Sequence, residues 1–259
     1  MSAPVVIKLG GAVLDDAEAV GAVWAGVAAL RQPAVLVHGG GPQATALARR
    51  LGHEPQIVAG RRVTSDLDLD VALWTLRGEL NARLVAAAPA AGVRAVGVSG
   101  VDGGLVRVAR RPPRRVDGAV VDFGHVGDVE AVDPTLALVL GAAGFVPVVA
   151  SVCADAAGAL YNVNADTVAA ELAAALGAAR LDLVTEAGGV RRDPADAATR
   201  VRQLAAAEAE AGVAEGWISG GMRPKLETAL DALRRGVPAV RVCAPADVAR
   251  PGAGTTVVP

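Results

Sequence analysis

The 259-residue sequence contains few cysteines, histidines and aromatic residues, and each shortage narrows the class of protein. Cys153 and Cys243 lie far apart, form no Cys-X-X-Cys pair and do not cluster with the three histidines, so neither a disulfide framework nor a structural zinc site is expected. This cysteine usage favours a reducing, cytoplasmic compartment. The residues before the first apolar run are too few for a signal peptide, and no apolar run is long enough to cross a membrane.

The sequence also lacks an excess of charge of either sign, since it contains 25 lysines and arginines and 27 aspartates and glutamates. A net charge of −2 gives no general affinity for nucleic acid or for an anionic membrane, so a small-molecule partner is expected. Two glycine-rich nucleotide-binding signatures are missing as well. No Gly-X-Gly-X-X-Gly motif is present, which argues against a Rossmann dehydrogenase, and no glycine-rich loop continues into Lys-Ser or Lys-Thr as in a P-loop.

Apolar runs alternate with helix-like stretches along most of the chain. This alternation predicts an α/β fold with a mainly parallel sheet and helices on both faces. Strands are expected at residues 5–9, 34–37, 93–99, 145–150, 181–185, 239–242 and 255–258, and helices at residues 15–30, 43–51, 65–88, 134–143, 166–176, 201–215 and 224–235. Residues 101–132 break the pattern with an arginine-rich, proline-containing stretch, which predicts a hairpin over one edge of the sheet. Residues 177–180 are the best candidate for a boundary between two lobes.

Lys8 lies near the end of the first apolar run and is followed by Gly10 and Gly11. A lysine in a buried strand is costly unless its ammonium group emerges at the end of the strand and meets a partner there. A second glycine turn, at residues 39–41, follows the next apolar run. Backbone amides and a positive charge at the carboxyl ends of parallel strands predict a site for a phosphate or a carboxylate.

Polar residues next to two predicted helices extend this picture. Arg62 precedes the acidic start of a helix, and its forked guanidinium is suited to gripping a carboxylate. Asn162, Asn164 and Asp166 precede or open another helix, and a single helix cap accounts for only one of them. We therefore expect Asn162 to bind a polar group of a substrate and Asp166 to orient a nearby lysine.

Lys225 lies in the segment that most clearly indicates a functional site from local sequence alone. Pro224 fits the N1 position of a helix, which places Lys225 in the first turn, where a positive charge is unfavourable by about 0.3–1 kcal/mol. The arrangement makes sense if an anion shares the helix N-terminus, and Gly220 and Gly221 would let a phosphate approach.

In this order, and along nearly the whole chain, these motifs resemble the amino-acid kinase family, and within it the members that phosphorylate N-acetylglutamate. The resemblance rests on residues 7–11 (Ile-Lys-Leu-Gly-Gly), 38–42 (His-Gly-Gly-Gly-Pro), 62–64 (Arg-Val-Thr), 162–166 (Asn-Val-Asn-Ala-Asp) and 220–222 (Gly-Gly-Met) with Lys225. It implies a three-layer αβα sandwich, with an amino-acid lobe at residues 1–177, a hairpin lid at about 101–132 and an ATP lobe at residues 178–259. The implied reaction is ATP-dependent phosphorylation of the side-chain carboxylate of N-acetyl-L-glutamate, in arginine biosynthesis.

The resemblance also implies roles for individual residues. Lys8 and Lys225 would stabilise the transferring phosphoryl group, and Asp166 would orient them. Substrate contacts are implied at Gly10, Gly11, Gly40, Gly41, Arg62 and Asn162. Nucleotide contacts are implied at Thr185, Glu186, Gly189, Val190, Arg191, Trp217, Ile218, Ser219, Gly221 and Met222.

A carboxylate acceptor is already ionised at neutral pH, so this reaction needs no general base and His38 is expected to be structural. The barrier comes from repulsion between anions, which lysines, glycine amides, helix N-termini and Mg²⁺ relieve. ATP with Mg²⁺ is the expected cofactor, the metal being held mainly by the phosphates. Glu186 and Gly188 depart from the Asp and the Pro or Ser that are usual in relatives, and the extra methylene of Glu186 is expected to shift a nucleotide or lysine contact.

The resemblance leads to an expectation about assembly. Arginine-inhibited relatives carry an additional N-terminal helix that builds a hexamer, and its absence here predicts an arginine-insensitive homodimer. The seam is expected along the helix at residues 65–88, where Gly78 permits close approach.

Two other functions fit parts of the pattern. A related kinase acts on aminoadipate or glutamate attached to a small acidic carrier protein, and a run of arginines in this chain could bind such a carrier. The alternative is that the run is only the solvated tip of a hairpin and binds no partner. This run consists of Arg107, Arg110, Arg111, Arg114 and Arg115. A catalytically weak regulatory relative is favoured only by Glu186 and Gly188, and the intact Lys8, Asp166 and Lys225 argue against it.

Overall fold

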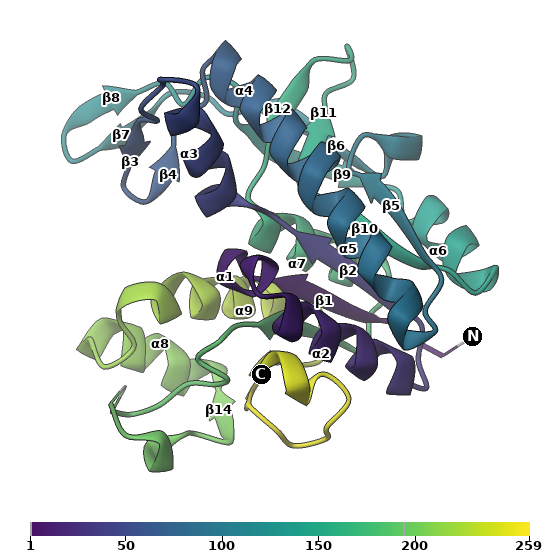
Figure 1. Cartoon of the computed structure of the whole chain (residues 1–259). Coiled ribbons are helices and arrows are strands. Elements are labelled where there is room, and N and C mark those ends of the chain that lie inside the picture. Colours follow the sequence, from purple (N-terminus) through teal and green to yellow (C-terminus); the bar gives the residue numbers. More distant parts are fainter. Residues whose placement is uncertain (1, 194) are drawn as a thin grey trace.

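The computed structural model describes residues 2–193 and 195–259, and its centre is an eight-stranded sheet (Figure 1). The six strands from β15 to β5 run parallel to one another, while β16 is antiparallel to β15 and pairs in parallel with β14. This confirms the predicted α/β fold and its mainly parallel sheet. In spatial order the strands are β14 (Gln203–Ala205), β16 (Thr255–Val258), β15 (Val240–Cys243), β13 (Arg180–Val184), β1 (Val5–Leu9), β2 (Ala34–His38), β10 (Val146–Ala150) and β5 (Ala95–Ser99).

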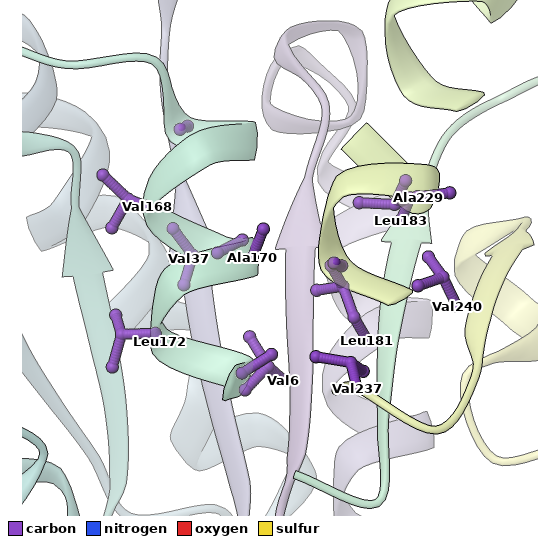
Figure 2. Close-up of a cluster of buried hydrophobic side chains, with 14 of the residues drawn as sticks. Val6, Val37, Val168, Ala170, Leu172, Leu181, Leu183, Ala229, Val237 and Val240 are labelled. Atoms are coloured by element: carbon purple, nitrogen blue, oxygen red, sulfur yellow. The ribbon is translucent and has the colours of Figure 1, made fainter. Parts of the chain in front are cut away.

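Helices cover both faces of this sheet, because successive residues of its central strands point to opposite sides. Val6 packs with α7 and α9 on one face, as Figure 2 shows, while Val5 and Ile7 pack with α1, α2 and α5 on the other. The first face carries α6 (Thr135–Ala142), α7 (Ala165–Ala175), α8 (Ala206–Glu215) and α9 (Arg223–Arg234), and the second carries α1 (Gly11–Asp15), α2 (Ala17–Ala29) and α5 (Asn81–Ala87). The arrangement is the three-layer αβα sandwich.

The helix predicted at residues 65–88 forms, but its middle is wider than an α-helix. It consists of α4 (Asp66–Ala72), the π-helical segment η1 (Leu73–Leu80) and α5, followed by the short 3₁₀ turn η2 (Ala88–Ala91). Ser65 caps its start in a capping box with Asp68. The helix α3 (Gly41–Arg50) carries Pro42 at N2.

Strands outside the central sheet build a cover over one end of it. The segment predicted as one hairpin over residues 101–132 contains two pairings: β6 (Val106–Arg110) with β9 (Gly127–Val132), and the hairpin of β7 (Arg114–Val116) and β8 (Ala119–Val121). The strands β11 (Val152–Ala154) and β12 (Leu160–Asn162), which were not predicted, extend the sheet of β6 and β9. A further hairpin joins β3 (Ile57–Val58) to β4 (Arg61–Arg62).

One prediction about the C-terminal third was wrong. Residues 203–205 were expected in a helix over 201–215 but form β14, because they pair with β16, and α8 begins only at Ala206. The central sheet continues across the proposed lobe boundary at residues 177 and 178, since β13 pairs with β1 along its full length. The division into lobes therefore stays a prediction. Among the described residues, no helix is long and apolar enough to span a membrane.

Candidate active site

Two cavities open at the carboxyl ends of the central strands. The first, of about 380 Å³, lies between the turns that follow β1 and β2 and the β3–β4 hairpin. Its lining includes the predicted residues Lys8, Gly11, Gly40, Gly41, Arg62, Asn162 and Asp166. The second, of about 510 Å³, lies between the loop after β13 and the loop before α9. Its lining includes Thr185, Glu186, Gly189, Val190, Arg191, Trp217, Ile218, Ser219, Gly221, Met222 and Lys225.

Lys8 and Asp166 form an ion pair in the first cavity, with Nζ 2.7 Å from Oδ1. The side chains are 13% and 19% exposed, so the lysine in the buried strand has the partner that its position requires. Asp166 is held in the first turn of α7, where Asn164 acts as N-cap and accepts a hydrogen bond from the Asp166 amide at 2.7 Å. An acidic side chain is favourable at this end of a helix.

Lys225 reaches the same region from the opposite end of the chain. It lies in the first turn of α9, with Pro224 at N2 rather than the expected N1, and its Nζ donates to the carbonyl of Gly221 at 2.8 Å. Burial and the positive charge of Lys8 lower the pKa of Lys225, while the charge of Asp166 acts in the opposite direction. The three residues predicted to be catalytic therefore interact electrostatically.

The two glycine turns pack closely against their surroundings and against each other. A Cβ on Gly40 would lie 2.3 Å from Leu80 Cδ1, and a Cβ on Gly11 would lie 2.9 Å from a ring carbon of Pro42. Gln43 joins the turns, since its Nε2 donates to the carbonyl of Gly11 at 2.8 Å. The Gly10 amide donates to the carbonyl of Val184 at 3.2 Å, so this group is committed to the backbone.

His38 is fully buried and forms a hydrogen bond with the second glycine turn, at residues 39–41. The Asn81 amide nitrogen, which can only donate, lies 3.0 Å from Nε2, so the proton is on Nδ1, which donates to the carbonyl of Gly39 at 2.9 Å. Burial lowers the pKa of His38 from 6.5 to about 4. A neutral imidazole held on both nitrogens has a structural role, as the sequence indicated.

Arg62 enters the first cavity with its guanidinium held on three sides. Its nitrogens donate to Thr45 Oγ1 at 2.6 Å, Asp68 Oδ1 at 3.1 Å and the carbonyl of Gly41 at 3.3 Å. Thr45 and Asp68 were not predicted as part of the site; Asp68 follows Ser65 at the spacing of a capping box, which indicates a helix start and not a binding site. Asn162 Nδ2 lies 3.4 Å from Thr64 Oγ1 at the other side of the cavity.

One member of the arginine run at residues 107–115 differs from the predicted description as a solvated tip, whereas Arg107, Arg110, Arg114 and Arg115 are exposed, as that description expects. Arg111 is buried, lines the first cavity and forms an ion pair of 2.6 Å with Asp128. The ion pairs of the neighbouring arginines are Arg107–Glu130, Arg110–Asp122 and Arg114–Asp128. Three carboxylates therefore offset part of the charge that was considered for an acidic carrier protein.

The second cavity is shaped by backbone and by an aromatic side chain. Gly188 has a φ of +65°, a left-handed conformation that favours glycine and that proline cannot adopt. Trp217 packs against α8 so closely that a Cβ on Gly212 would lie 2.5 Å from its indole ring. Glu186 is exposed and lines the cavity.

The family model of the amino acid kinase family matches residues 3–244. The chain belongs to the amino acid kinase family. The acetylglutamate kinase of Symbiobacterium thermophilum is 44% identical over 242 residues, which cover 92% of this chain and 83% of that protein. The acetylglutamate kinase of Sorangium cellulosum is 45% identical over 270 residues, with coverage of 99% and 95%.

Solved structures share the amino acid kinase fold with this chain. The N-acetylglutamate synthase of Neisseria gonorrhoeae, complexed with coenzyme A and N-acetyl-glutamate, has a TM-score of 0.82 at 24% identity. The match covers 99% of this chain but 59% of the synthase, so the present chain spans less than two thirds of that protein. The carbamate kinase of Giardia lamblia bound to AMP-PNP has a TM-score of 0.68 at 14% identity and matches over 99% of this chain and 98% of that one.

Proposed function

We propose that this chain is an acetylglutamate kinase, which transfers the γ-phosphoryl group of ATP to the side-chain carboxylate of N-acetyl-L-glutamate. The observation that carries the proposal is the ion pair of Lys8 and Asp166 in the first cavity, in electrostatic contact with Lys225 of the second. Two cavities that meet at positive charges suit a reaction between two anionic substrates. The names and the high coverage of the curated relatives support the same substrate.

The first cavity takes the amino acid in this proposal. The guanidinium of Arg62 pairs with the α-carboxylate, and Asn162 binds a polar group of the substrate. The amides of the two glycine turns face the side-chain carboxylate and the phosphoryl group that it receives. The carboxylate oxygen attacks the γ-phosphorus as the bond to the β–γ bridging oxygen breaks, and no proton has to be removed because the acceptor is already ionised.

The second cavity takes ATP, and the two lysines act on the charge that develops during transfer. Lys8 and Lys225 approach the transferring group from different elements, and Asp166 holds Lys8 in position. Burial lowers the pKa of Lys225 most, and the nearby ammonium group of Lys8 lowers it further; a phosphate between the two lysines would offset both effects. Mg²⁺, held mainly by the phosphates, would supply further charge neutralisation at this site.

The proposal extends to assembly and location. Trp74 is 52% exposed on η1, the segment that contains Gly78, which supports a homodimer joined along α4, η1 and α5. Sedimentation of the purified chain as a monomer would contradict this seam. Cys153 and Cys243 are free and buried, which supports a reducing cytoplasmic location.

An ATP-dependent acylphosphate assay with hydroxylamine trapping tests the function directly. N-acetylglutamate, glutamate, aspartate and aminoadipate are compared as free substrates, and carrier-linked aminoadipate is a separate arm. We expect the highest kcat/KM with N-acetylglutamate. Activity confined to the carrier-linked substrate, or no turnover of any acceptor, would overturn the proposal.

A further inference from the structure

The contacts of Asp68 extend beyond its part in capping α4. Its side chain is 3% exposed, and its two oxygens receive different partners. Oδ1 accepts from Arg62 at 3.1 Å, whereas Oδ2 lies 3.0 Å from His53 Nε2 and accepts from the Ser65 hydroxyl at 2.7 Å. Burial alone would raise the pKa of Asp68, but hydrogen bonds from Ser65, His53 and Arg62 lower it below its ordinary value, so the carboxylate is charged at neutral pH.

His53 and Arg62 stand at the two ends of the segment that carries β3 and β4. The single carboxylate of Asp68 thus contacts both ends of this segment, one through each oxygen. Ile57, Gly60 and Arg61, which lie between those ends, line the first cavity. A fixed position of Asp68 on α4 therefore sets where the hairpin lies over the cavity.

We propose that Asp68 is a positioning residue, which holds Arg62 and the base of the β3–β4 hairpin in the arrangement that receives the α-carboxylate of the substrate. The inference rests on the proposed function for the identity of that substrate. Asp68 itself does not touch the amino acid. Its effect passes through the guanidinium of Arg62, whose side chain is 10% exposed and fixed on its other side by Thr45.

Without its hydrogen bond to Asp68, the Arg62 side chain would become ordered only when the substrate binds. Long side chains lose considerable rotamer entropy when they are immobilised, and a binding site that is ordered in advance avoids that cost at the moment of binding. Loss of this hydrogen bond should therefore weaken binding of the amino acid. It should leave nucleotide binding and the phosphoryl-transfer step nearly unchanged, because Lys8 and Lys225 do not contact this network through any hydrogen bond described.

The decisive variant is Asp68→Asn, which keeps the volume of the side chain and removes its charge. We expect KM for N-acetylglutamate to rise about tenfold, while KM for ATP and kcat change by less than about twofold. Asp70→Asn is the matched control, because it removes a carboxylate from an exposed position of the same helix and leaves Asp68 in place. Equal increases in both KM values, or the same increase in Asp70→Asn, would show that Asp68 only stabilises the helix.

A substrate analogue separates positioning from general damage. 4-Acetamidobutanoate keeps the reacting carboxylate and the acetamido group but lacks the α-carboxylate that Arg62 would bind. We expect wild type and Asp68→Asn to use this analogue with equal kcat/KM. A tenfold loss with the analogue would overturn the assignment.

A measurement without substrate distinguishes failure of this inference from failure of the proposed function. Rotation of the Arg62 guanidinium can be followed by ¹⁵N NMR of its side chain, with assignment from an Arg62→Lys variant. We expect slow rotation in the wild-type protein and faster rotation in Asp68→Asn, whether or not N-acetylglutamate is the substrate. Unchanged rotation would refute positioning by Asp68, even in an active acetylglutamate kinase.

Discussion

The two cavities differ in how their walls are held. In the first, charged and polar side chains hold one another: Arg62 is bonded to Thr45 and Asp68, and Gln43 joins the two glycine turns. The second is lined by residues of two loops and by Lys225, whose Nζ donates to the carbonyl of Gly221. Figure 1 shows α3 and α4, which contribute residues to the first cavity, in the upper part of the view, and α8, against which Trp217 of the second cavity packs, in the lower part.

This difference matches two kinds of recognition. Directed hydrogen bonds from a braced guanidinium discriminate strongly between small acids, because an unmatched buried charge is costly. A cavity lined by glycines, apolar side chains and an indole ring accepts a large ligand mainly by shape and by apolar contact, with a few charged groups to orient it. Substitutions in the first cavity should therefore affect the amino acid, and substitutions in the second should affect the nucleotide. The catalytic charges between them should affect the rate of transfer.

The largest effect is expected for Lys8, which lines the first cavity and interacts electrostatically with Lys225 of the second. Lys8→Ala should lower kcat by about 10²–10³-fold, because one preorganised positive charge facing the transferring phosphoryl group is lost. The measurement is the initial rate at saturating ATP and N-acetylglutamate. Lys8→Arg is the control, since it keeps the charge opposite Asp166 with a different shape, and it should recover only part of the rate. Turnover of Lys8→Ala near that of wild type, in a folded protein, would refute the proposed mechanism.

The next prediction concerns the stability that the fold gains from His38, the buried residue beneath the second glycine turn of the first cavity. A histidine titrates near pH 6.5 in an unfolded chain, whereas burial lowers the pKa of His38 to about 4. Between these values the unfolded chain binds a proton that the folded chain does not, so acidification destabilises the protein in this window and not above it. The contribution is at most about 3 kcal/mol.

Urea unfolding at pH 7.5 and at pH 4.5 measures this effect. The free energy of unfolding should fall less between the two pH values in His38→Gln than in wild type, since other groups titrate equally in both proteins. Parallel losses in the two proteins would mean that His38 is protonated in the folded state.

Gly212 offers a way to disturb the second cavity alone. A Cβ at this position of α8 would lie 2.5 Å from the Trp217 ring and 2.7 Å from a side-chain carbon of Ile218, so Gly212→Ala should displace this wall. We expect KM for ATP to rise about tenfold, with KM for N-acetylglutamate unchanged. Gly21→Ala in α2 is the control, because its Cβ would meet no atom within 4 Å. A rise in KM for the amino acid instead would remove the distinction between the cavities.

Sequence reasoning identified the residues whose chemistry conflicts with their surroundings. Lys8 in an apolar strand and Lys225 at a helix N-terminus both need a nearby anion, and this need was visible without coordinates. Thr45 and Asp68 were missed because nothing in their own segments is unusual. Their part in the site depends on the position of Arg62, which the fold determines.

Local patterns were also insufficient where pairing decided the structure. Residues 203–205 read as the start of a helix, yet they form a strand because β16 offers them an edge. Arg111 read as part of a solvated tip, yet it is buried because Asp128, 17 positions away, supplies its counter-charge. Both errors concern partners that are distant in sequence, which no local propensity describes.

The smallest effect is expected for Gln43, whose hydrogen bond to Gly11 joins the two glycine turns of the first cavity. Gln43→Met keeps the length of the side chain and removes this bond, which should lower kcat about threefold, in line with the net value of one hydrogen bond. Stability should change little, because Gln43 Oε1 is buried without a hydrogen-bond partner among the described residues, and its removal offsets the lost bond. Chemical unfolding and steady-state rates on the same samples separate the two effects. A fall in stability without a fall in kcat would show that the link holds the fold rather than the spacing of the turns.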